Sequence, residues 1–94
     1  MSEVSAYRVL IDTNSADENG VLLFIRDHLV ACVMRLDDPS HGRDRDRWCV
    51  ETAYGFDSRK LPETFLSIEA AISAISEEIC GSPLAVVGEL PALP

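Results

Sequence analysis

Two histidines and three cysteines are the side chains of this 94-residue sequence best suited to catalysis or metal binding. His28 and His41 both fall in predicted turns, and a histidine can accept or donate a proton near neutral pH. Neither lies at a spacing from a nucleophile and a carboxylate that indicates a catalytic triad. We therefore interpret both histidines as solvated turn residues and predict that the protein is not an enzyme.

The cysteines Cys32, Cys49 and Cys80 are separated by long, irregular gaps and form no Cys-x-x-Cys pair. This spacing indicates neither a zinc site nor a thioredoxin-type redox pair. An odd number of cysteines is not typical of a disulfide framework and favours a reducing compartment. We expect Cys32 and Cys49 to be buried, reduced thiols, and we place the protein in the cytoplasm.

Other motifs for cofactors and metals are missing from the sequence. There is no glycine-rich phosphate loop, no serine-centred elbow and no His-Glu-x-x-His. Asp44 and Asp46 are spaced like the first ligands of a calcium loop, but the glycine and the terminal glutamate of that loop are absent. We therefore predict no cofactor and no metal.

The charge balance of the chain limits its partners. Sixteen acidic and eight basic residues give a formal net charge of -8. A negative field of this size repels phosphate backbones and anionic lipid, so it argues against general nucleic-acid or membrane-surface binding. Residues 1–8 lack the apolar core of a signal peptide, and every apolar run is far shorter than the roughly 20 residues that span a bilayer.

The elements that must position these side chains are short strands followed by one helix. Runs of β-branched and aromatic residues separated by turn residues predict an antiparallel meander. Asn19-Gly20 supplies turn residues before the second strand, and Asp27-His28 is expected to form a two-residue hairpin turn. The predicted strands are 7–11, 21–26, 29–36 and 48–56. In addition, a short edge segment is expected at 64–66.

The region 67–81 carries the clearest pattern in the sequence. Ser67 suits an N-cap, Gly81 suits the residue after the last helical turn, and Pro83 prevents continuation. The apolar residues between them recur at helical spacing, which predicts one amphipathic helix. They are Ile68, Ala71, Ile72, Ile75 and Ile79, whereas Ser73, Ser76, Glu77 and Glu78 are expected to face outward.

These elements predict the α+β class: an antiparallel three- or four-stranded β-meander packed on one C-terminal amphipathic helix. We expect a single small domain over 1–94, with an ordered core of about 7–81 and tails at 1–6 and 82–94. In the fourth strand, alternation places Trp48, Tyr54 and Phe56 on one face, where we expect them to pack beneath the helix.

Two segments are candidate partner-binding sites. The loop around Arg43, Arg45 and Arg47 alternates positive and negative charges, a pattern that suits either ion-paired recognition or a solvated, self-neutralised loop. The C-terminal segment around Leu84, Val86 and Val87 is apolar and nearly uncharged, so it is expected to pack on its own sheet or add to the sheet of another chain.

The function predicted from these features is a small, non-enzymatic interaction module that forms a homodimer or binds another protein. The hairpin over 21–36 is apolar on both faces, and one helix can cover only one face. One alternative is a nucleic-acid-binding domain, because a sheet with a trailing helix resembles, in architecture alone, DNA-binding domains of the AP2 and integrase-arm type. The other is a small-molecule binder with a pocket at a dimer interface.

Overall fold

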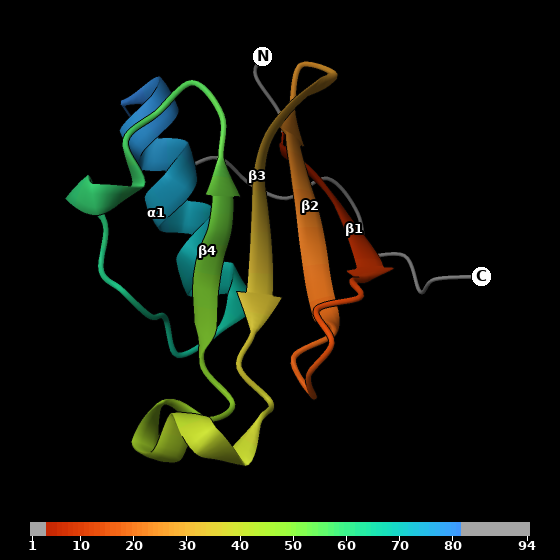
Figure 1. Ribbon diagram of the computed structural model, residues 1–94. Coiled ribbons are helices and arrows are strands. Elements are labelled where there is room, and N and C mark those ends of the chain that lie inside the picture. The colour runs from red at the N-terminus through yellow and green to blue at the C-terminus, as the bar shows by residue number, and fades with distance from the viewer. Residues whose placement is uncertain (1–3, 82–94) are drawn as a thin grey trace.

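The computed structural model describes residues 4–81. Four strands form one antiparallel sheet in the order β1-β2-β3-β4, and helix α1 follows them (Figure 1). The predicted α+β meander with a C-terminal helix is confirmed, and the sheet has four strands. The elements are β1 (Val4–Leu10), β2 (Asn19–Ile25), β3 (His28–Arg35), the 3-10 segment η1 (Pro39–Asp44), β4 (Trp48–Ala53), the 3-10 segment η2 (Ser58–Lys60) and α1 (Ile68–Cys80).

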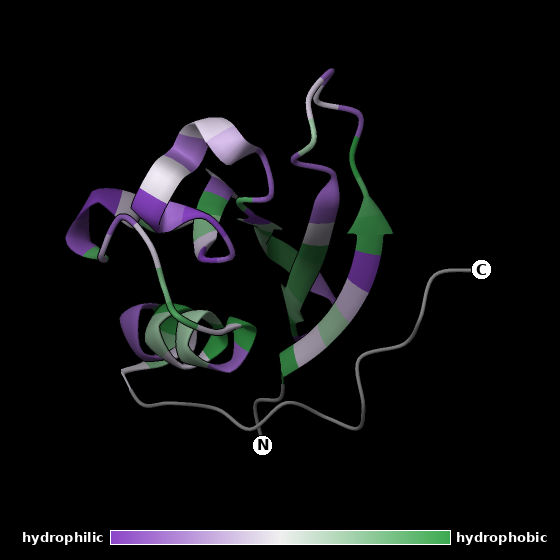
Figure 2. Cartoon of the chain, turned by 90° about the horizontal axis from the view of Figure 1, so that it is seen from below, coloured by the Kyte–Doolittle hydropathy of each residue, from purple (hydrophilic) through white to green (hydrophobic). Residues whose placement is uncertain are grey.

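The hydrophobic core lies between α1 and one face of the sheet. Figure 1 shows α1 on the β4 side of the sheet, and Figure 2 shows that hydrophobic residues belong mainly to the strands and α1. Trp48 and Phe56 pack against this core as predicted, whereas Tyr54 is 50% exposed. The buried core residues are Val4, Ala6, Val21, Leu23, Ile25, Ala31, Val33, Phe65, Ile68, Ala71, Ile72 and Ile75.

Helix α1 begins and ends where the capping residues predict. The Ser67 hydroxyl accepts a hydrogen bond from the Ala70 amide (3.1 Å), and Gly81 adopts a left-handed φ of 78°. The outward orientation expected for Ser76 is wrong. Ser76 is buried, because its small side chain donates a hydrogen bond to the carbonyl oxygen of Ile72 (2.7 Å) and so needs no water.

Strand β1 begins three residues earlier than predicted. The sequence suggested an unstructured start up to residue 6, but Val4 and Ala6 are 1% and 5% exposed. The register explains the difference, because Val4 pairs with Ile25 and Ala6 with Leu23 across the ladder. Cross-strand packing therefore extends the strand through Ala6, whose own strand propensity is weak, to Val4.

The hairpin between β2 and β3 turns one residue earlier than Asp27-His28. Ile25 pairs with His28, so the two turn residues are Arg26 and Asp27, with φ of 51° and 65°. Both positive values are those of a type I′ turn, which suits the twist of a two-residue hairpin. Gly20, expected in a turn, instead lies within β2, where Ile11 packs against its bare backbone.

Strand β4 departs from simple alternation at a β-bulge. Val33 pairs with Val50, but Cys32 pairs with Thr52, so Glu51 is the extra residue. The bulge reverses the faces of the residues after it, and the strand ends at Ala53 rather than at residue 56. This reversal explains why Tyr54 does not reach the core. The predicted edge segment at 64–66 is a single bridge between Trp48 and Phe65.

Candidate functional site

The face of the sheet turned away from α1 carries two aromatic side chains. Tyr7 in β1 and Phe24 in β2 meet edge to face, with ring centroids 5.6 Å apart and an interplanar angle of 86°. Tyr7 is 49% exposed, and its Cα partner Leu22 is half-buried. Odd-numbered residues of β1 and even-numbered residues of β2 share this face, because paired residues in an antiparallel ladder point the same way.

These side chains border a shallow groove of about 370 Å³. The five lining residues come from β1, β2 and the hairpin turn, and only one of them is charged. They are Ser5, Tyr7, Leu22, Phe24 and Asp27. We call this set the sheet-face groove.

The predicted arginine site lies at the other end of the sheet from the hairpin turn that contributes Asp27. Arg43 and Arg45 are exposed in the β3–β4 connection, and Arg45 donates a hydrogen bond from Nε to the carbonyl oxygen of Asp37 (3.2 Å). Arg47 donates to the hydroxyl of Thr64 (3.4 Å). The structure does not bring these arginines to the sheet-face groove, and their binding of a partner stays a prediction. Leu84, Val86 and Val87 lie outside the described residues.

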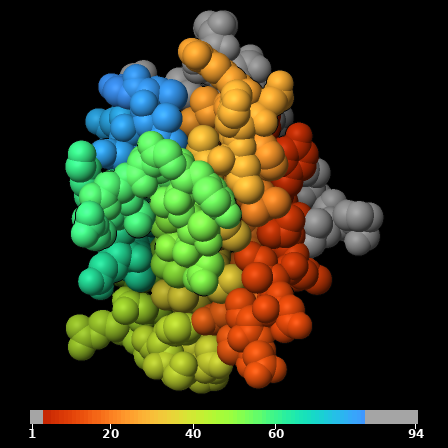
Figure 3. All heavy atoms as spheres, turned by 45° about the horizontal axis from the view of Figure 1, so that its top comes forward, coloured from red at the N-terminus to blue at the C-terminus, as the bar shows by residue number. Residues whose placement is uncertain are grey.

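A polar cluster that the sequence did not predict joins the two loops at this end. Asp17, in the β1–β2 loop, is 9% exposed. Its Oδ1 accepts hydrogen bonds from the backbone amides of Asp37 and Asp38, each at 2.6 Å, and its Oδ2 bonds to Nε2 of His41. Figure 3 shows the two loops packed side by side. His41 is therefore not the solvated turn residue that we expected.

The side chain of Asp37 extends this cluster toward the strands. Its Oδ1 accepts from Nε of Arg35 (2.7 Å), and its Oδ2 accepts from Nδ2 of Asn19 (2.9 Å). Asp38 accepts from the Ser40 amide (2.9 Å) and so caps η1. Sequence reasoning missed the cluster because its members come from two loops about twenty residues apart, and only the Asp-rich composition of those loops signals it.

Burial raises the pKa of Asp17, but the hydrogen bonds from His41, Asp38 and Asp37 outweigh burial and hold this pKa below the ordinary value of 3.8. Asp17 is therefore a carboxylate at neutral pH. Among residues 4–81, no hydroxyl or thiol is hydrogen-bonded to His41. The pair thus joins the two loops, and within the described residues no nucleophile completes it.

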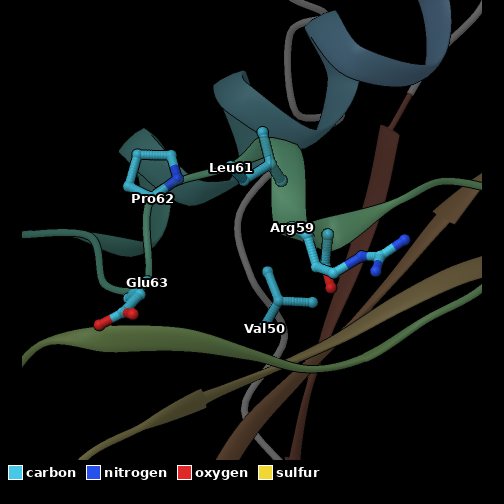
Figure 4. Close-up of a pocket in the computed structure, with 6 residues that line it drawn as sticks. Val50, Arg59, Leu61, Pro62 and Glu63 are labelled. Atoms are coloured by element: carbon cyan, nitrogen blue, oxygen red, sulfur yellow. The ribbon is translucent and has the colours of Figure 1, made fainter.

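A second hollow of about 360 Å³ lies between β4 and the segment after η2. In Figure 4, Val50 and Leu61 face each other across it, while Arg59 and Glu63 point outward on different sides. The Arg59 guanidinium is already held by Asp57, through Nε to Oδ1 at 3.0 Å and a second contact to Oδ2 at 3.2 Å. The hollow therefore offers an apolar floor but no uncommitted guanidinium for an anionic ligand.

The cysteines do not form a reactive cluster. Cys32 and Cys49 are half-buried free thiols, and Cys80 is an exposed one. Burial, reinforced by the nearby Glu51 carboxylate, raises the pKa of both Cys32 and Cys49, so they are neutral at pH 7. Within residues 4–81, no three histidine, cysteine or acidic side chains are grouped so that they could hold a metal ion.

Comparisons with known proteins give no family for this chain. No family model, curated protein or solved structure matches it significantly. Among residues 4–81, there is no helix with the length and apolar character needed to cross a bilayer.

Proposed function

We propose that the protein is a non-enzymatic, cytoplasmic interaction module that associates with a second copy of itself through the surface around Tyr7, where the β1 edge meets the sheet face opposite α1. The observation that carries the proposal is the sheet-face groove, in which the exposed Tyr7 packs edge to face against Phe24. Tyrosine and phenylalanine bury a large area at low entropic cost, and aromatic residues dominate the energetics of protein interfaces.

The sheet-face groove suits contact with a second copy even though the chain is acidic. Two molecules of net charge -8 repel each other over most of their surfaces. In the sheet-face groove, Asp27 is the one charged residue among five, so contact there desolvates few charges. Because a two-fold contact uses the same patch twice, a self-complementary apolar face is sufficient to form it. The three free thiols support a reducing compartment.

The proposal is tested by titrating a labelled copy of the full chain with an unlabelled copy. Cys80 is the exposed thiol, whereas Cys32 and Cys49 are half-buried with raised pKa, so a maleimide dye attaches selectively at Cys80. We expect fluorescence anisotropy to rise and saturate in the micromolar range. A flat signal up to several hundred micromolar unlabelled protein overturns the proposal.

Tyr7 and Tyr54 form a matched pair for this titration, since they are 49% and 50% exposed. Tyr7 lines the sheet-face groove, whereas Tyr54 follows the strand at the opposite edge of the sheet. We expect Tyr7→Ala to weaken self-association at least tenfold and Tyr54→Ala to change it less than twofold. Equal effects of the two substitutions would place the contact elsewhere on the molecule.

A further inference from the structure

Strand β1 is an edge strand that carries few of the features that protect sheet edges. Among residues 4–81, its one pairing partner is β2. It contains no proline, its ladder with β2 has no bulge, and Arg8 is its one charged residue. Natural proteins guard exposed edges with prolines, bulges or several charges. The other edge is guarded, because Phe65 bridges to Trp48 in both directions, at 2.8 and 2.7 Å.

The ladder identifies which backbone groups of β1 point away from β2. The Ile11 amide donates to the carbonyl oxygen of Glu18 (2.8 Å), so the backbone hydrogen-bonding groups of Ile11 point toward β2. Direction alternates along a strand, and Tyr7 and Val9 therefore also bond toward β2. The amides and carbonyls of the intervening residues point outward, and these residues are Val4, Ala6, Arg8 and Leu10.

We propose that β1 pairs antiparallel with β1 of a second copy, with Tyr7 opposite the same tyrosine of the partner on a two-fold axis. The proposal rests on the self-association proposed above and specifies its geometry. Two four-stranded sheets then join into one sheet of eight. The outward backbone groups of Val4, Ala6, Arg8 and Leu10 then form the hydrogen bonds of the new ladder, so each gains a partner in the other copy.

Strand alternation and charge select this register. In an antiparallel ladder, the backbone amides and carbonyls of two opposite residues must both point toward the partner strand or both point away from it. Only registers with a residue of β1 on the two-fold axis meet this condition. Centring on Arg8 places two guanidinium groups face to face, which is unfavourable. Centring on Ala6 leaves Val9 and Leu10 unpaired. Centring on Tyr7 pairs the whole strand and sets each Arg8 opposite Ala6 of the other copy.

The same register continues the aromatic surface across the axis. Tyr7 bonds toward β2, so in the new ladder it belongs to a non-hydrogen-bonded pair, whose Cα atoms lie about 4.5 Å apart with close side chains. Both tyrosines are on the face opposite α1, each packed edge to face against its own Phe24. Because β1 has no acidic residue, the edge also brings no carboxylates of the strand together, despite the net charge of -8.

Photochemical tyrosine cross-linking of the full chain tests this geometry directly. The chain has two tyrosines, Tyr7 and Tyr54, so each can be replaced conservatively. We expect a brief flash, with a ruthenium complex as sensitiser and persulfate as electron acceptor, to give a covalent dimer in the wild type and in Tyr54→Phe. The yield should be at least tenfold lower in Tyr7→Phe. Peptide mapping should find the cross-link joining Tyr7 to Tyr7. A cross-link that maps to Tyr54 overturns the proposed register.

Substitution of Arg8, whose backbone amide points away from β2, gives a second, independent test. Arg8→Pro removes an amide that β2 does not use, whereas Arg8→Ala removes only the charge. In the labelled titration we expect Arg8→Pro to weaken self-association at least tenfold relative to Arg8→Ala. If both variants bind like the wild type while the wild type does associate, β1 pairing is wrong and self-association stands.

Hydrogen exchange tests whether another part of the same chain, rather than a second copy, covers the β1 edge. At nanomolar dilutions, where the chain is monomeric, the Ala6 and Arg8 amides should exchange rapidly, and they should become protected as the dimer forms at higher concentration. Slow exchange of these amides in the monomer would show that the chain itself already covers the edge, and that result overturns the proposal. A chain that is monomeric at every concentration overturns both proposals.

Discussion

Asp17 and His41 are 24 residues apart in the sequence, yet a hydrogen bond between Oδ2 and Nε2 joins them across two loops at one end of the sheet. The same carboxylate also accepts hydrogen bonds from the backbone amides of Asp37 and Asp38. A buried carboxylate with three donors fixes the β3–β4 connection to the β1–β2 loop. The two loops are therefore expected to open and close as one unit.

Replacing Asp17 with asparagine should destabilise the fold. Asp17→Asn keeps the shape of the side chain but removes the charge that strengthens the hydrogen bonds from the two amides and from His41. We expect the free energy of unfolding to fall by about 1–3 kcal/mol. Urea denaturation measures this change. The control is the exposed Asp12→Asn, which removes the charge from a carboxylate that accepts one local hydrogen bond from the Asn14 amide. A loss for Asp17→Asn as small as that for the control would contradict the proposed role.

The contribution of Asp17 to stability should depend on pH in a defined direction. Its pKa in the folded chain lies below the ordinary 3.8, so the unfolded chain takes up the proton first as pH falls. The stabilisation is complete above pH 3.8 and is lost as pH drops from 3.8 through the lower folded value. Urea midpoints of wild type and Asp17→Asn should therefore differ by a constant amount near neutral pH and converge below pH 3.8. A difference between the two midpoints that grows as pH falls would contradict this prediction.

Adding a methyl group at Gly20 should overpack the sheet. A Cβ at this position would lie 2.5 Å from Cδ1 of Ile11 and 3.3 Å from Cγ2 of Val9. We expect Gly20→Ala to reduce the free energy of unfolding by about 1–3 kcal/mol. Shortening the opposing side chain in the double variant Gly20→Ala with Ile11→Val removes Cδ1 and should restore part of the loss. If the losses of unfolding free energy in Gly20→Ala and Ile11→Val simply add up in the double variant, the two residues do not contact each other.

A glycine at Asp27 should stabilise the hairpin. Asp27 occupies the second central position of the β2–β3 turn at φ 65°, where glycine is strongly preferred. We expect Asp27→Gly to raise the free energy of unfolding by about 0.5–1 kcal/mol, because relief of the left-handed strain exceeds the added entropy of the unfolded chain. The converse change, Gly55→Ala at φ 77°, has free space for the methyl group and should destabilise through backbone strain alone. Thermal melts of the two variants should shift in opposite directions.

Local patterns in the sequence predicted the elements that depend on neighbouring residues. Helix α1 was predicted with both caps, since the apolar stripe, Ser67 and Gly81 all act within one segment. The Glu51 bulge was not predicted, because an extra residue becomes visible only against the partner strand. The hydrogen bond between Asp17 and His41 was also missed, since neither turn indicates which distant loop it will meet. Tyr7 was predicted to be in a strand, but its edge-to-face contact with Phe24 depends on the β1–β2 register.

Sedimentation equilibrium of the full wild-type chain tests the central claim, that the chain self-associates into a dimer, most directly. We predict a weight-average mass that rises with concentration from the 10.3 kDa of one chain toward twice that value and no further. Because a two-fold contact closes after two copies, the data should fit a monomer–dimer equilibrium. A mass that stays at 10.3 kDa up to several hundred micromolar would contradict the account.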